Sequence, residues 1–166
     1  MNHTALTAVD LLTKSQQEWS ISLPQMQYKN IQGLEVPEIG LGTYKLHDRE
    51  CSRIVRQALD IGYRHIDTAQ MYKNEREIGE ALSVSNVDRQ DIFLSTKIWH
   101  TNLEADDVLQ STEESLRQLD TPYVDLLMIH WPNDQYDLRA TIESMLVLRD
   151  QGKAMNIGVS NFPLQL

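Results

Sequence analysis

The sequence contains a single cysteine, Cys51, so the chain cannot form a disulfide bond within itself. One free cysteine suits a reducing compartment, and we expect a cytoplasmic protein. Cys51 lies on the apolar side of a predicted helix, which favours a buried structural thiol over a reactive one. No apolar run approaches the roughly 18 residues of a membrane span. Residues 1–20 also lack the basic start and apolar core of a secretory signal.

Positive charge is scarce as well. The 166 residues include 15 Lys and Arg against 24 Asp and Glu, giving a formal net charge of −9. A chain this acidic is a poor partner for a phosphate backbone, so we expect no nucleic acid partner. No long block of like charge occurs, so the acidic excess predicts a solvated surface. The proportions of hydrophobic (41%) and charged (23%) residues are those of an ordinary globular domain.

Nucleotide-binding glycine motifs are absent too. Gly40 and Gly42 do not extend into Gly-x-Gly-x-x-Gly, and no Walker pattern occurs. What the chain does contain is a strict alternation of apolar strands and amphipathic helices after a predicted β-hairpin at 26–37, which indicates a parallel sheet covered by helices. The predicted strands cover 38–43, 62–68, 92–98, 124–129 and 156–161, and the predicted helices cover 48–61, 75–82, 103–119 and 138–151.

Polar side chains end several of these strands, which favours a (β/α)₈ barrel (TIM barrel) over an open doubly wound sheet. A complete barrel needs roughly 250 residues, and the chain ends soon after its fifth predicted strand. We therefore predict an α/β fold in which residues 26–166 supply about the first five strands of a (β/α)₈ barrel. Residues 1–25 are predicted to be an N-terminal extension.

The polar strand ends suggest a site for proton transfer. Asp67 and Lys97 lie near the ends of the second and third strands, Tyr72 lies in the loop after Asp67, and His130 follows the fourth strand. A free phenol has a pKa of about 10, so it is a weak acid at neutral pH. We expect the Lys97 ammonium to lower the pKa of Tyr72, and Asp67 to keep Lys97 charged. A neutral imidazole at His130 can donate a hydrogen bond to the same oxygen.

Five short motifs give the chain a resemblance to the aldo-keto reductase family, from about Gln27 to Phe162. They occur in the family's order and at plausible spacing, so together they are far more specific than any one alone. The motifs are Gly40-Leu41-Gly42-Thr43-Tyr44, Gly62 to Ala69 with Tyr72, Asn74 and Glu75, Ser95-Thr96-Lys97, Asp125 to Pro132, and Gly158-Val159-Ser160-Asn161-Phe162. Thr96 to Trp99 and Tyr123 to Pro132 most resemble bacterial 2,5-diketo-gluconate reductases, which also reduce small dicarbonyls such as methylglyoxal.

The resemblance implies a (β/α)₈ barrel opened by an N-terminal hairpin, and NADPH-dependent reduction of aldehydes, ketones or keto sugars by hydride transfer. It implies that Tyr72 donates the proton with help from Lys97 and Asp67, while His130 orients the carbonyl. The other implied roles fall to two groups of residues. Cofactor binding is implied for Gly42, Thr43, Asp67, Ser160 and Asn161, and substrate binding for Tyr44, Trp99, His130 and Trp131.

Each of these residues also has an ordinary structural interpretation. Taken singly, Asp67 could pair with a helix start, Tyr72 could be a half-buried surface aromatic, and His130 could be a satisfied core histidine. Four such coincidences in one family's order disfavour that interpretation for the group. For His65 we favour a structural role, and for Trp99 packing and substrate binding are equally supported.

Two other functions compete with carbonyl reduction. In the family the phosphate and adenosine contacts come from later strands, so we expect residues 1–166 alone to bind NADPH weakly. A catalytically weak half-barrel that self-associates through open sheet edges is therefore an alternative. A metal-dependent hydrolase that binds zinc through His65, Asp67 and His130 is the less favoured one.

Overall fold

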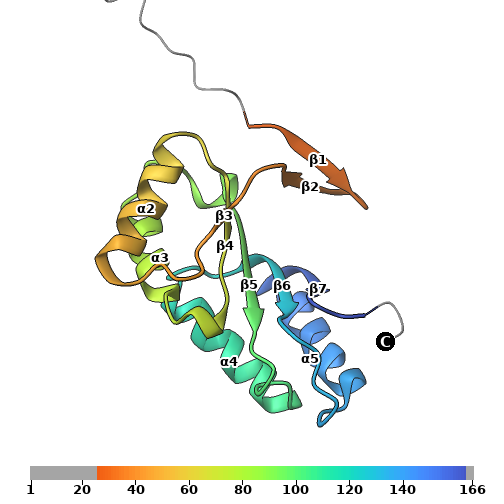
Figure 1. Ribbon diagram of the computed structural model, residues 1–166. Helices are drawn as coiled ribbons and strands as arrows, with labels where there is room; N and C mark the ends of the chain where they lie inside the picture. The colour runs from red at the N-terminus through yellow and green to blue at the C-terminus, as the bar shows by residue number, and fades with distance from the viewer. Residues whose placement is uncertain (1–25, 164–166) are drawn as a thin grey trace, which may run out of the picture.

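The computed structural model describes residues 26–163 (Figure 1), so the predicted extension 1–25 and residues 164–166 lie outside the described part of the chain. Five parallel strands form one sheet in chain order, and an antiparallel hairpin precedes them. The strands are β1 Tyr28–Ile31, β2 Leu34–Pro37, β3 Leu41–Gly42, β4 His65–Asp67, β5 Phe93–Ile98, β6 Val124–Ile129 and β7 Ala154–Val159. The helices are α2 Asp48–Asp60, α3 Glu75–Ser83, α4 Ala105–Gln118 and α5 Leu138–Asp150, with short 3₁₀ helices η1 Gln70–Tyr72 and η2 Arg89–Asp91.

The predicted hairpin is confirmed. Tyr28 pairs with Pro37 and Ile31 pairs with Leu34, so two residues, Gln32 and Gly33, make the turn. Both turn residues have positive φ angles, 53° and 88°, as a two-residue hairpin turn that matches strand twist requires.

The two outermost strands differ from prediction. The predicted strand at 38–43 is a strand only at Leu41–Gly42, and these residues are half-buried and exposed. The predicted strand at 156–161 begins at Ala154 and is largely half-exposed. Among the described residues each of these strands pairs on one side only, so neither is covered as a central strand would be.

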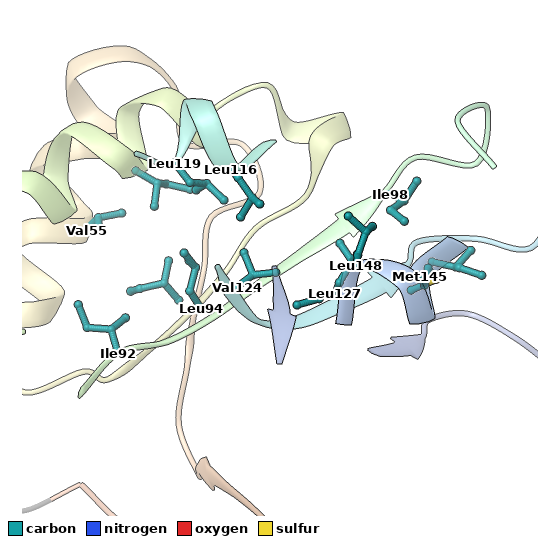
Figure 2. Close-up of a cluster of buried hydrophobic side chains, with 14 of the residues drawn as sticks. Val55, Ile92, Leu94, Ile98, Leu116, Leu119, Val124, Leu127, Met145 and Leu148 are labelled. Carbon is teal, nitrogen blue, oxygen red and sulfur yellow. The ribbon is translucent and has the colours of Figure 1, made fainter. Parts of the chain in front are cut away.

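The core lies between the sheet and helices α2 to α5, which follow one another along one side of it (Figure 1). Helix α2 shows why the helices form: its buried residues recur on one face, and Gly62, with φ 105°, follows its end. Figure 2 shows side chains from strands β5 and β6 meeting those from α2, α4 and α5. The labelled members include Val55, Leu94, Ile98, Leu116, Leu119, Leu127, Met145 and Leu148.

The two faces of strand β5 carry different chemistry. Leu94 and Ile98 belong to the apolar core under the helices and have no exposed surface. Ser95 and Lys97 alternate with them and so project from the opposite face. The strand thus supplies core packing on one face and polar groups on the other.

Helices α3 and α4 touch through their backbones. A Cβ atom on Gly79 of α3 would lie 2.4 Å from the carbonyl oxygen of Gln118 in α4, so no other residue fits there without moving a helix. Within residues 26–163, no helix is both long and apolar enough to cross a lipid bilayer.

Candidate active site

Asp67 and Lys97 form an ion pair across neighbouring strands. Asp67 ends β4 and pairs in register with Ser95, two residues before Lys97 on the same face of β5. Lys97 Nζ lies 2.7 and 2.6 Å from the two carboxylate oxygens of Asp67 and 2.9 Å from the backbone oxygen of Thr68. These three acceptors match the three protons of the ammonium group, so a lysine that is only 7% exposed has its charge balanced.

Tyr72 and His130 complete the group of four predicted catalytic residues. Tyr72 ends η1, the 3₁₀ helix in the loop after β4, and its ring centroid lies 5.5 Å from Lys97 Nζ. The His130 ring contacts the Tyr72 ring edge to face, with 5.7 Å between centroids. The His130 backbone nitrogen donates to the backbone oxygen of Ile98, which fixes the start of the loop after β6 beside β5. The structure therefore brings all four side chains to the carboxyl ends of adjacent parallel strands.

The predicted effect of Lys97 on Tyr72 is wrong for this state of the protein. Burial raises the pKa of the Tyr72 phenol above its usual value, and the charge of Asp67 and the neighbouring Tyr44 raise it further. The physical reason is that the phenol is partly buried and lies near the negative charge of Asp67, and both disfavour the charged phenolate. Tyr72 is accordingly a protonated donor at neutral pH.

His130 is an uncharged imidazole at neutral pH. Burial lowers its pKa below the usual value, and the positive charge of Lys97 lowers it further. Within residues 26–163 its Nδ1 atom is buried and has no hydrogen-bond partner. That leaves Nε2 as the ring nitrogen able to present a proton to a ligand.

Two residues of the implied cofactor group lie at the end of β3. Gly42 pairs in register with Asp67, and a Cβ placed on it would meet no atom within 4 Å, so the space over its backbone is open. Thr43 is fully buried, and its nitrogen and hydroxyl both donate to the backbone oxygen of Asp67, at 3.0 and 3.1 Å. Thr43 therefore supports Asp67, whereas Gly42 leaves room for a bound group.

The other two residues of that group follow β7. The Ser160 nitrogen donates to the Ile129 oxygen at 2.8 Å, which places this loop beside His130. Asn161 has a left-handed backbone (φ 62°), and its side-chain nitrogen donates to the His130 backbone oxygen at 2.8 Å and to Ser160 Oγ at 2.9 Å. Within residues 26–163 the Asn161 amide oxygen and the Ser160 hydroxyl proton are not used in these hydrogen bonds, so both can bond a ligand.

Aromatic side chains surround the phenol and the imidazole. The Tyr44 ring lies 5.1 Å from that of Tyr72, and the Trp99 ring lies 5.4 Å from that of His130. Trp131 is 48% exposed and, in the described part of the chain, makes no ring contact with the others. Tyr44 and Trp99 therefore form two apolar walls. Trp131 is placed near the site because it directly follows His130 in the sequence.

A large cavity lies beside this site rather than in it. It has a volume of about 760 Å³ and is lined by the loops after β5 and β6, the start of α5 and Phe162, but by none of the four predicted catalytic residues. We identify the site from the convergence of ionisable groups, because cavity size alone carries no chemistry.

His65 has a structural environment. Its ring packs edge to face on Phe93 at 4.8 Å, and its Nε2 lies 3.4 Å from Ser95 Oγ. A Cβ on Gly40 would lie 2.9 Å from this ring, so Gly40 makes room for His65 rather than for a ligand. Asp67 is engaged by Lys97, and within residues 26–163 no three His, Cys, Asp or Glu side chains gather as metal ligands.

Two amide residues that support the site were not predicted as site residues. Buried Asn74 donates to the backbone oxygens of Thr43 and Leu46 and accepts from the Thr68 hydroxyl, which joins the loops after β3 and β4. Gln70, two residues before Tyr72, bonds the loop after β5. Their polar types within a loop gave no indication of which partners they would find.

Comparisons with known proteins point to one family. Residues 38–166 match the aldo/keto reductase family. The chain is 42% identical over 135 residues to methylglyoxal reductase DkgB of Yersinia pestis, covering 80% of this chain and 51% of that protein.

Solved structures show the same relationship. The crystal structure of a putative 2,5-diketo-D-gluconic acid reductase B matches with a TM-score of 0.80 and 43% identity, covering 83% of this chain and 49% of that one. An aldo-keto reductase of Bombyx mori in complex with NADP matches with a TM-score of 0.75 and 34% identity, covering 83% of this chain and 51% of that one. The predicted five strands of a barrel are confirmed, and the chain spans about half the length of the relatives it matches. From its sequence, its fold and these matches, the chain belongs to the aldo/keto reductase family.

Proposed function

We propose that the protein reduces small aldehydes and ketones with NADPH, and that Tyr72 donates the proton. The observation that carries this proposal is the convergence of Tyr72, Lys97, Asp67 and His130 at one edge of the parallel sheet. A protonated phenol, a charged ammonium and a neutral imidazole together suit the conversion of a carbonyl oxygen to a hydroxyl.

The proton in this reaction comes from the protein. NADPH, when bound, would supply the hydride for the carbonyl carbon. The Tyr72 hydroxyl transfers its proton to the carbonyl oxygen as the carbon–oxygen double bond becomes single, leaving an alcohol and a phenolate. The Lys97 ammonium, 5.5 Å from the Tyr72 ring centroid, stabilises that phenolate until it takes a proton from water.

His130 orients the carbonyl in this proposal. A neutral imidazole with its proton on Nε2 donates one hydrogen bond to the carbonyl oxygen, and the lowered pKa of His130 keeps that form dominant at neutral pH. The oxygen is then held by two donors, the phenol and the imidazole, whose rings are 5.7 Å apart.

The cofactor site is proposed at the ends of β3 and β7. The open space over Gly42 fits a group that lies close to the backbone beside Asp67. The Ser160 hydroxyl and the Asn161 amide oxygen fit the carboxamide of a nicotinamide, which has both a donor and an acceptor.

We propose small dicarbonyls such as methylglyoxal as the substrate class. The Tyr44 and Trp99 rings flank the phenol and imidazole, and flat apolar walls favour a short, planar carbonyl compound. Relatives named methylglyoxal reductase and 2,5-diketo-D-gluconic acid reductase support this choice.

The test compares Tyr72→Phe with the parent protein. We expect NADPH oxidation driven by methylglyoxal to fall about 10²- to 10⁴-fold, because the proton donor is lost. NADPH affinity, followed by quenching of cofactor fluorescence, is expected to stay the same, since the change removes only a hydroxyl group.

Tyr28→Phe in the exposed hairpin is the matched control and should leave both measurements unchanged. Normal turnover by Tyr72→Phe would refute the assigned proton donor. Absence of turnover in the parent protein at saturating NADPH would refute the proposed reaction.

A further inference from the structure

We infer that Gln70 is a positioning residue that sets the distance between the Trp99 wall and the proton donor, and that it thereby tunes selectivity for small carbonyl substrates. This inference rests on the proposed function and adds to it a residue that touches neither substrate nor cofactor. Gln70 lies in η1, two residues before Tyr72, and its side chain reaches the loop after β5.

The Gln70 amide makes three hydrogen bonds to two other segments. Its oxygen accepts from the backbone nitrogen of Trp99 at 2.9 Å and from the side-chain nitrogen of Asn102 at 3.1 Å. Its nitrogen donates to Ser115 Oγ of helix α4 at 3.2 Å. Because a backbone N–H and an amide NH₂ can only donate, the partners require the amide oxygen to face Trp99.

The far end of this chain of bonds is fixed in the core. Ser115 is 1% exposed, and it bonds the buried carboxyl of Glu75 in α3. Glu75 in turn accepts from the Thr96 hydroxyl of β5 at 2.6 Å. Gln70 is therefore held against a rigid part of the fold, and the Trp99 loop is held against Gln70.

The other side of the Trp99 loop is held separately. Asn133 donates to the His100 backbone oxygen at 2.8 Å, and the Tyr136 hydroxyl donates to the Thr101 backbone oxygen at 3.0 Å. Both residues come from the loop after β6, so they tie Trp99 to the His130 side of the site. Among these ties, Gln70 supplies the one that reaches the segment bearing Tyr72.

These contacts allow Gln70 to set the distance between the Trp99 ring and the Tyr72 proton donor. The Trp99 ring lies 5.4 Å from the His130 ring, and the Tyr72 ring lies 5.7 Å from the same imidazole. Loss of the Gln70 bonds frees the Trp99 backbone on one side while the proton donor stays in place. A wall that can move away admits bulkier aldehydes and holds small ones less well.

A cavity gives water access to the hydrogen bond between the Trp99 N–H and the Gln70 side chain. The cavity, of about 260 Å³, lies between η1, α3 and α4, and the residues that line it include Gln70, Asn102 and Ser115. If Gln70 no longer accepts from the Trp99 N–H, this cavity gives solvent a path to that amide. Hydrogen exchange at the Trp99 amide therefore reports directly on the tie.

The experiment measures Trp99 amide exchange and substrate selectivity in three variants. The chain has three tryptophans, so ¹⁵N-tryptophan labelling gives three backbone amide signals, which Trp19→Phe and Trp131→Phe assign. Gln70→Met keeps the side-chain length but removes every hydrogen bond. Gln70→Glu keeps the acceptor oxygens, and Gln57→Met removes a surface hydrogen bond to Arg53 as the matched control.

We expect Gln70→Met to speed exchange of the Trp99 amide about fivefold, as loss of one hydrogen bond of about 1 kcal/mol predicts. We expect the selectivity ratio, kcat/KM for methylglyoxal over that for a bulky aromatic aldehyde, to fall about tenfold, mainly through a higher KM for methylglyoxal. Gln70→Glu should restore slow exchange and most of the selectivity, and Gln57→Met should change neither.

Unchanged Trp99 exchange in Gln70→Met would overturn the inference, and so would faster exchange with unchanged selectivity. A parent protein that never oxidises NADPH refutes the proposed function instead, and the exchange measurement then still decides whether Gln70 fixes the Trp99 loop.

Discussion

The two faces of strand β5 have different roles, core packing on one face and polar chemistry on the other. The face toward the helices carries Leu94 and Ile98, which are fully buried in an apolar cluster, whereas the opposite face carries Ser95 and Lys97, which bond Asp67. Packing on the first face depends on shape and apolar area. Function on the second depends on the placement of charge and protons, so substitutions on the two faces should affect different measurements.

Thr96 is where this division is incomplete. It lies on the helix-facing side of β5, yet its hydroxyl donates to the buried carboxyl of Glu75, and the bonds continue through Ser115 to Gln70. A polar chain thus crosses from the packed face to the loop that carries the proton donor. Polar groups in the core therefore help to shape the site, because they anchor Gln70, which holds the Trp99 loop.

The largest effect is expected from Lys97→Met, on the polar face. Turnover of NADPH should fall about 10³-fold, because the phenolate of Tyr72 loses its nearest cation. The free energy of unfolding should change little by comparison, since Asp67 keeps its bond from Ser95 and is partly exposed to water. Lys29→Met, in the exposed pair with Glu38, is the control. Steady-state kinetics and urea denaturation of both variants measure the two effects. Normal turnover in Lys97→Met would contradict the assignment of function to the polar face of β5.

Leu94→Ala should produce the opposite result. We expect the free energy of unfolding to fall by about 3 kcal/mol, since Leu94 has no exposed surface and its removal leaves a cavity among the residues of Figure 2. The folded fraction should keep its kcat, because the side chain faces away from Lys97. Urea denaturation gives the stability change, with the exposed Val147→Ala as the control. A loss of kcat in fully folded Leu94→Ala would show that packing also governs the chemistry.

The smallest effect is expected from Glu75→Gln, within the polar chain. Burial raises the pKa of Glu75 above its usual 4.5, although bonds from Thr96 and Ser115 oppose the shift. A carboxyl with a raised pKa favours folding below its unfolded pKa, and this contribution is lost as pH rises through the folded value. Glu75→Gln should therefore gain stability relative to the parent as pH rises from 4.5 and then level off, by less than the effect of Leu94→Ala.

Urea denaturation across this pH range measures the difference. Exposed Glu80→Gln, which loses only a surface pair with Arg76, should give a nearly flat difference. A difference for Glu75→Gln that shrinks with rising pH would mean that the folded protein prefers the ionised carboxyl.

Apolar patterning was enough to predict the central elements. Strand β6 runs over Val124–Ile129 as predicted, because a strand covered by helices favours a nearly continuous apolar run, here interrupted only by Asp125. The meeting of the polar strand ends was also predictable, since parallel strands bring their carboxyl ends to one edge of the sheet. The patterning failed at β3, where residues 39–42 looked apolar enough for a buried strand but only Leu41 and Gly42 form one, with a single strand partner in the described chain.

The charge balance around Tyr72 was not predictable from residue types. An ammonium beside a phenol lowers its pKa, but burial of the Tyr72 phenol raises that pKa, and the negative charge of Asp67 raises it further. Gln70 was missed for a related reason. A side-chain amide in a loop has no characteristic spacing, and its partners Trp99 and Ser115 lie 29 and 45 residues away in the sequence.

The glycine contact between α3 and α4 has a mechanical consequence. Backbone packs directly on backbone there, so any side chain at position 79 would push α3 away from α4. Tyr72 lies three residues before the start of α3, so we expect such a displacement to move the proton donor relative to the His130 imidazole.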